Sequence, residues 1–242
     1  MTQTEFEAAI KSGRKDFSGE DLRGADLQEL DLRGFDFSGA FLRRANLSTA
    51  DLQGAALQEV DLRWANLSGA ILRKLDLSGI DLREANLRGA DLSRANLSSA
   101  NLSRANLSSA YLQGADMQRA NLKEATLHNA DLQEADLEEA DLAEAGLWKA
   151  DLTGADLDSA DLTRAYLWKA DLRGANLQDA NLESADLSKA DLCQANLQGA
   201  ILRKVNLCKA DLQGADLQGA DLRGANLSGA DFSGANLAGA LR

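Results

Sequence analysis

Proline is absent from this sequence, and histidine and cysteine are nearly so: one histidine and two cysteines occur among 242 residues. Because proline lacks a backbone N–H group, its absence from so long a chain suggests an architecture that uses its backbone donors almost everywhere. The cysteines, Cys193 and Cys208, are too few for the disulfide framework of a small secreted domain. The single histidine, His128, has no second imidazole to work with. We therefore predict no catalytic site and no metal site.

Long hydrophobic runs and phosphate-binding loops are missing as well. No stretch of about eighteen apolar residues occurs, so no membrane-spanning helix is predicted. Residues 1–17 lack the apolar core of a secretory signal, which makes the cytoplasm the expected location. The net charge of −12 disfavours direct binding to nucleic acid or to an anionic membrane. No Gly-rich loop interrupts the chain, and neither a cofactor nor a small-molecule substrate is expected.

What the sequence does contain is a repeat of five residues from Asp16 onward. One position of the repeat falls at residues 17, 22 and so on to 237, and 41 of these 45 residues are leucine. The residue before is aspartate in 24 repeats and asparagine in 13, and the residue two before is nearly always alanine. We number the repeat so that aspartate or asparagine stands at position 1, leucine at position 2 and alanine at position 5. A repeat this regular has to be explained before any other feature.

A period of five fits neither a helix nor a straight strand. On a helix, five residues advance about 500°, so the leucines would spread around the axis. On a strand, an odd period would place successive leucines on opposite faces. The pattern fits a chain that turns after every five residues, with alanine and leucine inward and the residue between them outward. Like residues recur at intervals of twenty, as Trp148 and Trp168 or Arg43 and Arg63 do, which indicates four sides in each coil.

This A(D/N)LXX pattern resembles the pentapeptide-repeat family over residues 16 to 241, and its regularity is similar to that of cyanobacterial members. The resemblance implies an all-β fold, a right-handed quadrilateral β-helix. The 45 repeats make about eleven coils, roughly 55 Å long at the usual spacing between strands. We therefore expect an N-terminal capping helix and lead-in at 1–15 and a repeat domain at 16–242.

The N-terminal end of such a rod needs a cap, because a bare end exposes unpaired backbone and apolar core. Thr4 and Glu7 fit a capping box, and the segment that follows can form a short helix ending near Gly13. Phe6 and Ile10 would then close the first coil.

At the other end the repeat continues to the last residues, and no cap is predicted. Phe232, Leu237 and Leu241 would stand at an open edge of the core. Pairing this end with a second copy of itself would bury both the edge and the core, and a two-fold pairing is closed. The expected result is a homodimer through the C-terminal end.

Charged residues form columns along the expected rod. Nine aspartates from Asp31 to Asp231 share one side, at intervals of about 5 Å at which like charges repel. Four lysines each precede an aspartate of this column by two residues: Lys149, Lys169, Lys189 and Lys209. In another column, three arginines follow an aspartate by two residues: Arg23, Arg63 and Arg83. One interpretation is a strip of ion pairs that balances the aspartates, and the other is an electrostatic docking surface.

Aromatic residues interrupt the polar surface on the side that carries asparagine at residues 46, 66, 86 and 106. Thr126, Gly146 and Tyr166 replace asparagine there, and His128, Trp148 and Trp168 each follow two residues later. We call His128, Gly146, Trp148, Tyr166 and Trp168 the aromatic cluster, and we expect Gly146 to leave a hollow in it. Exposed aromatic residues often mark interfaces, so the cluster is a candidate partner-binding patch. The alternative is a stacked pair that only protects the rod.

A second candidate patch lies nearer the N-terminus and consists of Phe41, Arg43, Arg44, Arg63 and Trp64, which we call the arginine cluster. With no catalytic constellation in the chain, these patches favour a non-enzymatic, rod-shaped interaction or scaffold protein whose partner is another protein.

The alternative function is suggested by the family resemblance. The family includes bacterial proteins that protect DNA gyrase from fluoroquinolones with an acidic surface that imitates DNA, and the aspartate column invites that comparison. This sequence differs from that subgroup because no loop interrupts the coils and no C-terminal dimerisation helix is present. Regulation of gyrase or of another DNA-binding protein by mimicry of DNA is therefore kept as a second hypothesis.

Overall fold

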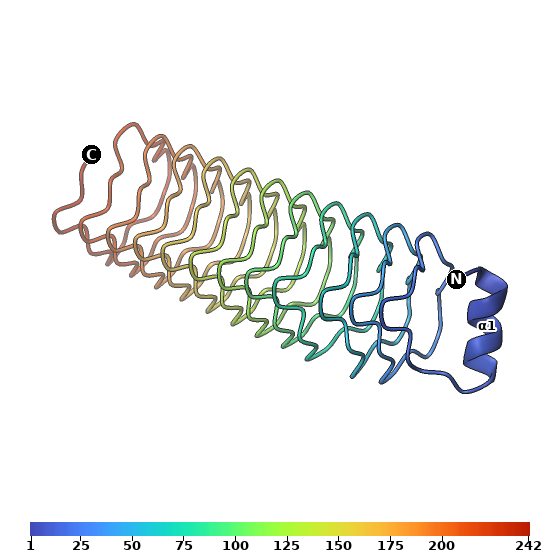
Figure 1. The fold of residues 1–242 in the computed structure, drawn as a ribbon. Helices are drawn as coiled ribbons and strands as arrows, with labels where there is room; N and C mark the ends of the chain where they lie inside the picture. The colour runs from blue at the N-terminus through green and yellow to red at the C-terminus, as the bar shows by residue number, and fades with distance from the viewer.

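The computed structural model describes residues 1–242, which form a straight rod of stacked coils with one helix at its N-terminal end (Figure 1). The helix, α1, spans Gln3–Lys11 and lies across the first coil. From Asp16 onward the chain winds as a right-handed quadrilateral β-helix, as the repeat predicts. The termini lie at opposite ends of the rod (Figure 1).

Each side of a coil is too short to form a strand of its own and contributes one parallel bridge at position 1. The bridges join residues twenty apart, from Asp16 with Asp36 to Asp221 with Leu241. This spacing confirms four sides per coil, with each pentapeptide forming one side and one corner.

The backbone N–H groups of one pentapeptide explain why proline is absent. Positions 1, 2 and 4 donate to carbonyls of neighbouring coils, as Asn46, Leu47 and Thr49 do at 2.9, 2.7 and 2.8 Å. Position 5 closes the turn, as when Ala50 donates to the carbonyl of Leu47 at 3.1 Å. Position 3 donates to the side chain at position 1, as Ser48 does to Asn46 Oδ1 at 3.3 Å. Within the rod, a repeat with aspartate or asparagine at position 1 thus uses all five donors, and a proline at any of its positions would remove a hydrogen bond.

The corner after each side is a β-turn whose position-4 residue has a positive φ. This holds at all 45 corners, and 27 of these residues are not glycine. Left-handed backbone is unfavourable for residues with a side chain, and an inter-coil hydrogen bond from the N–H of position 4 holds all of them there except Glu59. The leucine–alanine pattern of the sequence does not predict this left-handed conformation at position 4.

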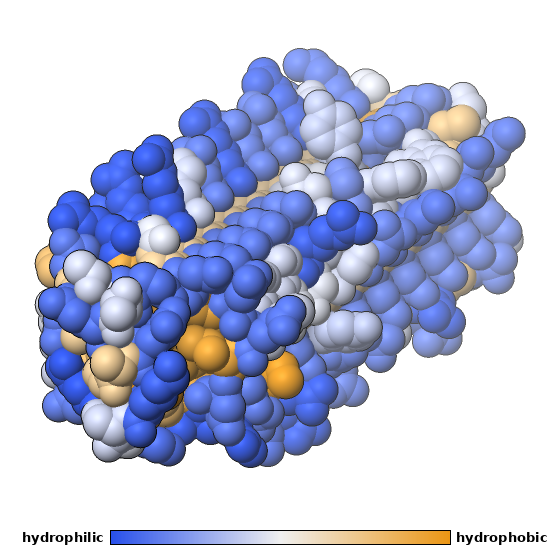
Figure 2. Space-filling view, turned by 90° about the vertical axis from the view of Figure 1, so that its right-hand side faces the viewer, coloured by the Kyte–Doolittle hydropathy of each residue, from blue (hydrophilic) through white to orange (hydrophobic).

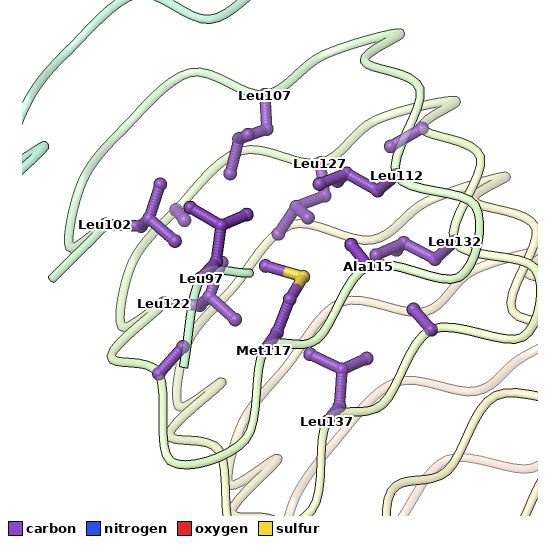
Figure 3. Close-up of a cluster of buried hydrophobic side chains, with 14 of the residues drawn as sticks. Leu97, Leu102, Leu107, Leu112, Ala115, Met117, Leu122, Leu127, Leu132 and Leu137 are labelled. Carbon is purple, nitrogen blue, oxygen red and sulfur yellow. The ribbon is translucent and has the colours of Figure 1, made fainter. Parts of the chain in front are cut away.

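The core is a narrow shaft filled by the leucines of position 2 and the alanines of position 5. In Figure 3 these side chains point into the coil from all sides, and Met117 takes the place of a leucine between Leu97 and Leu137. Larger residues replace alanine at Leu75 and Ile80, which are both buried. Close to them the bridge between Ala56 and Asp76 is missing from its column.

The cap begins two residues earlier than the sequence suggested. The capping box is formed by Thr2 and Glu5, not by Thr4 and Glu7: Glu5 N–H donates to Thr2 Oγ1 at 3.3 Å, and Thr2 N–H donates to Glu5 Oε2 at 2.7 Å. The sequence contains two overlapping T-x-x-E motifs, and the first of them forms the capping box. The Met1 ammonium group next to it donates a hydrogen bond to the Asp21 carbonyl oxygen at 2.8 Å.

The two ends of the rod differ in whether the apolar core is covered. At the N-terminal end Phe6 of α1 is fully buried, with its ring 4.8 Å from that of Phe17. In the last coil, Phe232 and Leu237 are only partly buried, and Leu241 is half exposed. The apolar shaft is therefore covered by α1 at one end and open at the other.

Candidate functional site

The surface is mostly hydrophilic, and exposed apolar residues occupy small separate areas (Figure 2). Five large hydrophobic residues are exposed: Phe41, Tyr111, Trp148, Tyr166 and Leu241. All except Trp148 stand at position 1, where the repeat normally has aspartate or asparagine. Breaks in the rule at position 1 therefore mark the unusual parts of the surface. Tyr111 was not among the candidate residues, although the same break would have identified it.

The aromatic cluster is brought together as the spacing of twenty predicts. The rings of Trp148 and Trp168 lie one coil apart with centroids 5.8 Å apart and an interplanar angle of 35°. His128 lies on the other side of Trp148 at 5.2 Å, edge to face at 80°. Trp148 is 37% exposed and Tyr166 58%, so the cluster presents aromatic area to solvent.

The hollow expected at Gly146 is not present, because the imidazole of His128 fills it. A Cβ atom added at Gly146 would lie 2.6 Å from His128 Cε1. The glycine thus allows the ring of the preceding coil to pack against the backbone. His128 Nδ1 is buried without a hydrogen-bond partner. Desolvation lowers the pKa of His128 below its usual 6.5, against an opposing effect of the Gly146 backbone.

The predicted strip of ion pairs between lysines and aspartates does not form. Lysine side chains lie over the tryptophan rings instead: Lys149 Nζ is 5.2 Å from the centroid of Trp148, and Lys169 Nζ is 4.6 Å from that of Trp168. Lys189 Nζ is 5.7 Å from the same Trp168 ring. These are cation–π distances. The lysine charges therefore lie on the aromatic cluster and not on the aspartate column.

The direction of the aspartate side chains explains this difference. Asp151 Oδ1 accepts from the N–H and the hydroxyl of Thr153, at 3.0 and 2.7 Å, so its carboxylate turns toward the corner that follows it. Lys149 stands at the corner before it. A residue two positions after an aspartate can therefore reach the carboxylate, and one two positions before it does not.

The aromatic cluster also leaves backbone donors free. Where Thr126, Gly146 and Tyr166 stand at position 1, no side chain accepts the N–H two residues later. The N–H groups of His128, Trp148 and Trp168 consequently have no acceptor within the chain. Three such donors recur in successive coils, a feature that becomes visible only once the role of position 1 is known.

The arginine cluster is also assembled, around the ring of Trp64. Arg43 lies over this ring at 4.3 Å from its centroid, and Arg44 and Arg63 are each 5.9 Å away. The indole N–H of Trp64 donates to Glu84 Oε2 in the next coil at 3.0 Å, which fixes the plane of the ring. Phe41 stands at position 1 and is half exposed.

The predicted arginine–aspartate pairs do form. Arg63 binds Asp61 at 2.7 Å and reaches Asp81 of the next coil at 3.6 Å, which relieves repulsion within the column. Arg23 pairs with Asp21 of its own repeat at 2.5 Å, and the hydrogen bonds from Arg23 lower the pKa of Asp21 to about 2. Such arginines neutralise parts of the aspartate columns while leaving the surface acidic overall.

Cys193 lies between Asp191 and Asp211, with one ligand-type atom from each residue within 4.8 Å of the others. Burial, followed by hydrogen bonds to the two carboxylates, raises the pKa of the Cys193 thiol to about 12. A thiol held protonated is a poor metal ligand, because the thiolate is the binding form. Cys208 is a second free cysteine. The one helix, α1, is too short and too polar to cross a bilayer.

The sequence profile described as pentapeptide repeats matches the chain in overlapping segments from residue 14 to residue 239. The chain belongs to the pentapeptide-repeat family. Comparison with curated protein sequences gives no match.

Solved structures of pentapeptide-repeat proteins resemble this chain to different degrees. HetL, which is involved in heterocyst differentiation regulation in the cyanobacterium Nostoc sp. strain PCC 7120, is 34% identical with a TM-score of 0.66, over 99% of this chain and 96% of HetL. Rfr23 from the cyanobacterium Cyanothece 51142 is 40% identical over 38% of this chain and 63% of its own, with a TM-score of 0.37. A trypsin-treated form of QnrB1, a plasmid-mediated fluoroquinolone resistance protein, shares the fold at a TM-score of 0.52 and 18% identity, over 90% of this chain and 89% of its own.

Proposed function

We propose that this protein is a non-enzymatic scaffold that binds another protein through the aromatic cluster. The observation that carries the proposal is the replacement of asparagine by Thr126, Gly146 and Tyr166 in three successive coils, beside His128, Trp148 and Trp168. The stability of the rod does not require this change, since asparagine at position 1 accepts the hydrogen bond from the backbone N–H of position 3.

The cluster offers a partner three kinds of contact. Trp148 and Tyr166 supply exposed aromatic area, which commonly anchors protein interfaces. The lysines over the tryptophans supply positive charge. The free N–H groups of successive coils supply donors, about 5 Å apart along the rod. A segment that carries apolar side chains and acceptor groups fits this combination.

A retention experiment tests this proposal. The purified protein is immobilised, and proteins retained from a lysate of its own organism are compared between the wild type and the double variant Trp148→Ser/Trp168→Ser. We expect the double variant to lose a partner that the wild type retains. Tyr111→Ser is the control, because Tyr111 is an exposed aromatic residue on another side of the rod. Retention of the same partners by all three proteins, each folded, would contradict the proposal.

The likeness to HetL supports a regulatory setting for such a scaffold, because HetL is involved in the regulation of a differentiation process. We extend to this chain only the idea of a regulatory interaction in the cytoplasm. The partner would be a protein, with no direct contact to nucleic acid or membrane.

A second function, mimicry of DNA, is favoured by one observation. Six aspartates in successive coils, from Asp131 to Asp231, form an unbroken acidic column. Gln133 and Gln213 donate hydrogen bonds to this column without neutralising its charge, and the one ion-pairing cation within it is Arg173, which binds Asp171 at 2.5 Å and reaches Asp191 at 3.7 Å. A gyrase supercoiling assay with the protein titrated in tests this function: inhibition or protection at low micromolar concentration supports it, and no effect there rejects it.

Self-association through the C-terminal end is a further proposal. The partly buried Phe232 and Leu237 form an apolar surface that a second copy of the same end would cover. Sedimentation equilibrium at tens of micromolar tests this: we expect a dimer that dissociates in Leu237→Glu. A monomer in both proteins would reject the proposal.

A further inference from the structure

Arginines at position 3 follow a simple rule where an aspartate stands at position 1 of the same repeat or of the next coil. When aspartate stands at position 1 of the same repeat, the guanidinium folds back onto that carboxylate, as Arg83 does to Asp81 at 2.9 and 2.7 Å. Six arginines do this: Arg23, Arg33, Arg63, Arg83, Arg173 and Arg223. When position 1 is isoleucine, the arginine reaches the aspartate of the next coil, as Arg203 does to Asp221 at 2.5 Å.

Arg43 breaks this rule. Its repeat has Phe41 at position 1, so it has no carboxylate of its own, and Asp61 of the next coil stands where Asp221 stands for Arg203. Asp61 pairs with Arg63, but Asp221 accepts both Arg203 and Arg223, so an occupied aspartate is no obstacle.

Besides Phe41 in place of Ile201 at position 1, the two corners differ at position 4 of the next coil. The corner of Arg203 has Gly224 there, and the corner of Arg43 has Trp64. The indole ring, fixed by its bond to Glu84, lies 4.3 Å from the Arg43 guanidinium carbon. Stacked on Trp64, Arg43 forms no ion pair with Asp61 and acts on that carboxylate only at longer range.

The neighbouring residues of the two corners differ in charge as well. Lys204 pairs with Glu183 of the preceding coil at 3.5 Å. Arg44, at the same position of the other corner, forms no ion pair, because the residue equivalent to Glu183 is Arg23. Arg23, Gly24, Arg43 and Arg44 line a cavity of about 450 Å³ that contains no acidic side chain.

We propose that Arg43 and Arg44 form an oxyanion-binding site for a phosphomonoester group, with Trp64 as the positioning residue that keeps Arg43 free. Two unpaired guanidinium groups match the charge of a phosphomonoester, which is close to −2 at neutral pH. The planar fork of each guanidinium fits phosphate oxygens. The site lies on a different corner from the aromatic cluster and stands independently of it.

Titration with three phosphate ligands tests the site: inorganic phosphate and two phosphomonoesters, a phosphoserine peptide and adenosine monophosphate. Binding is followed by calorimetry and by the NMR signal of the Trp64 indole N–H, in salt of about 0.15 M so that long-range charge effects are screened. We expect all three to bind and the unphosphorylated peptide and adenosine not to bind. Tighter binding of the peptide would indicate a protein source for the phosphate, and tighter binding of the nucleotide a nucleotide source.

The double variant Arg43→Ala/Arg44→Ala should weaken phosphate binding at least about tenfold, which corresponds to the loss of one good charge-assisted contact. The matched control is Arg203→Ala/Lys204→Ala, which removes the same charge from the equivalent corner and should leave binding unchanged. Equal losses in both variants would indicate a general charge effect and overturn the proposal, as would no loss in the first.

Trp64→Gly separates positioning from charge. Glycine stands at the equivalent position 224 and tolerates the positive φ of 57° found at Trp64. We expect Arg43 to form an ion pair with Asp61, and phosphate binding to weaken as a result, although no arginine is removed. Wild-type affinity in Trp64→Gly would show that the indole does not keep Arg43 free, and it would overturn that part of the proposal.

Binding should also follow the protonation of the ligand. The second pKa of a phosphomonoester is about 6, so the dianion is lost between pH 7 and pH 5 while both arginines stay charged. We expect weaker binding at pH 5, and equal binding at the two pH values would contradict a site that requires the dianion.

Discussion

The aromatic cluster and the arginine cluster are built from the same kinds of side chain on two different corners of the rod. In the aromatic cluster, rings occupy position 3 in three successive coils and pack on one another at 5.2 and 5.8 Å. In the arginine cluster, a single ring at position 4, that of Trp64, lies beneath the Arg43 guanidinium at 4.3 Å. Both clusters begin where position 1 has lost its aspartate or asparagine.

The comparison teaches that the position of a ring within the repeat decides what it contacts. A ring at position 3 lies in line with the position-3 residues one coil away, so three successive breaks produce a packed column. A ring at position 4 stands at the far side of the turn, where it reaches cations of its own and of the preceding coil. The rings of the aromatic cluster therefore pack on one another and also contact lysines, whereas the ring of Trp64 packs on no other aromatic ring and contacts arginines.

The largest expected effect on stability comes from truncating the core, and it should be similar beneath both clusters. Both rest on the same leucine shaft, with Leu147 and Leu42 fully buried beneath them. Truncation of a buried leucine to alanine typically costs about 2–5 kcal/mol. We expect Leu147→Ala and Leu42→Ala to lower the free energy of unfolding by similar amounts in urea denaturation. A loss below about 1 kcal/mol at either site would mean that the shaft is poorly packed there.

A methyl group added at Gly146 should act on the aromatic cluster alone. The new Cβ would meet the His128 ring at 2.6 Å, and overpacking of this kind costs about 1–3 kcal/mol. We expect Gly146→Ala to be destabilising in the wild type and close to neutral in the background His128→Ala. Thermal unfolding of the four proteins of this cycle measures the coupling. Equal losses in both backgrounds would place the strain elsewhere than at His128.

Removal of the tryptophans should have a smaller effect on stability than on binding. Trp148→Ser/Trp168→Ser deletes two aromatic contacts, Trp148 with Trp168 and Trp148 with His128, and an aromatic pair is worth about 0.5–1.5 kcal/mol beyond its buried area. We expect a modest fall in melting temperature with the coil structure intact by circular dichroism. Global unfolding of the double variant would show that these rings belong to the core.

The smallest expected effect concerns the titration of one carboxylate at the N-terminal corner. The hydrogen bond from Arg23 lowers the pKa of Asp21 from 3.8 to about 2. Because the folded-state pKa is lowered, the pair stabilises the fold above the unfolded pKa of about 3.9, and this stabilisation is lost as the pH falls toward 2. We expect Arg23→Gln to raise the pKa of Asp21 measured by NMR. Asp231, which bonds Ser233 rather than an arginine, is the internal control and should not change.

The sequence by itself determined the architecture. A leucine every five residues, with alanine two before it, permits only a chain that turns at each repeat, and side-chain recurrence at twenty gives four sides. The same frame predicted the buried Leu147 and the column of Trp148 and Trp168, because register in a β-helix is fixed by which residues point inward.

Tertiary structure decided the contacts at the corners. The pattern predicted that lysines such as Lys149 would pair with aspartates, but the turn bends each carboxylate toward the residue that follows it, and the lysines settle on tryptophan rings. It predicted a hollow at Gly146 that His128 fills. Arg43 is free only because Trp64 of the next coil holds it. These outcomes depend on side-chain directions set by the turns and on neighbours twenty residues away, and the five-residue pattern specifies neither.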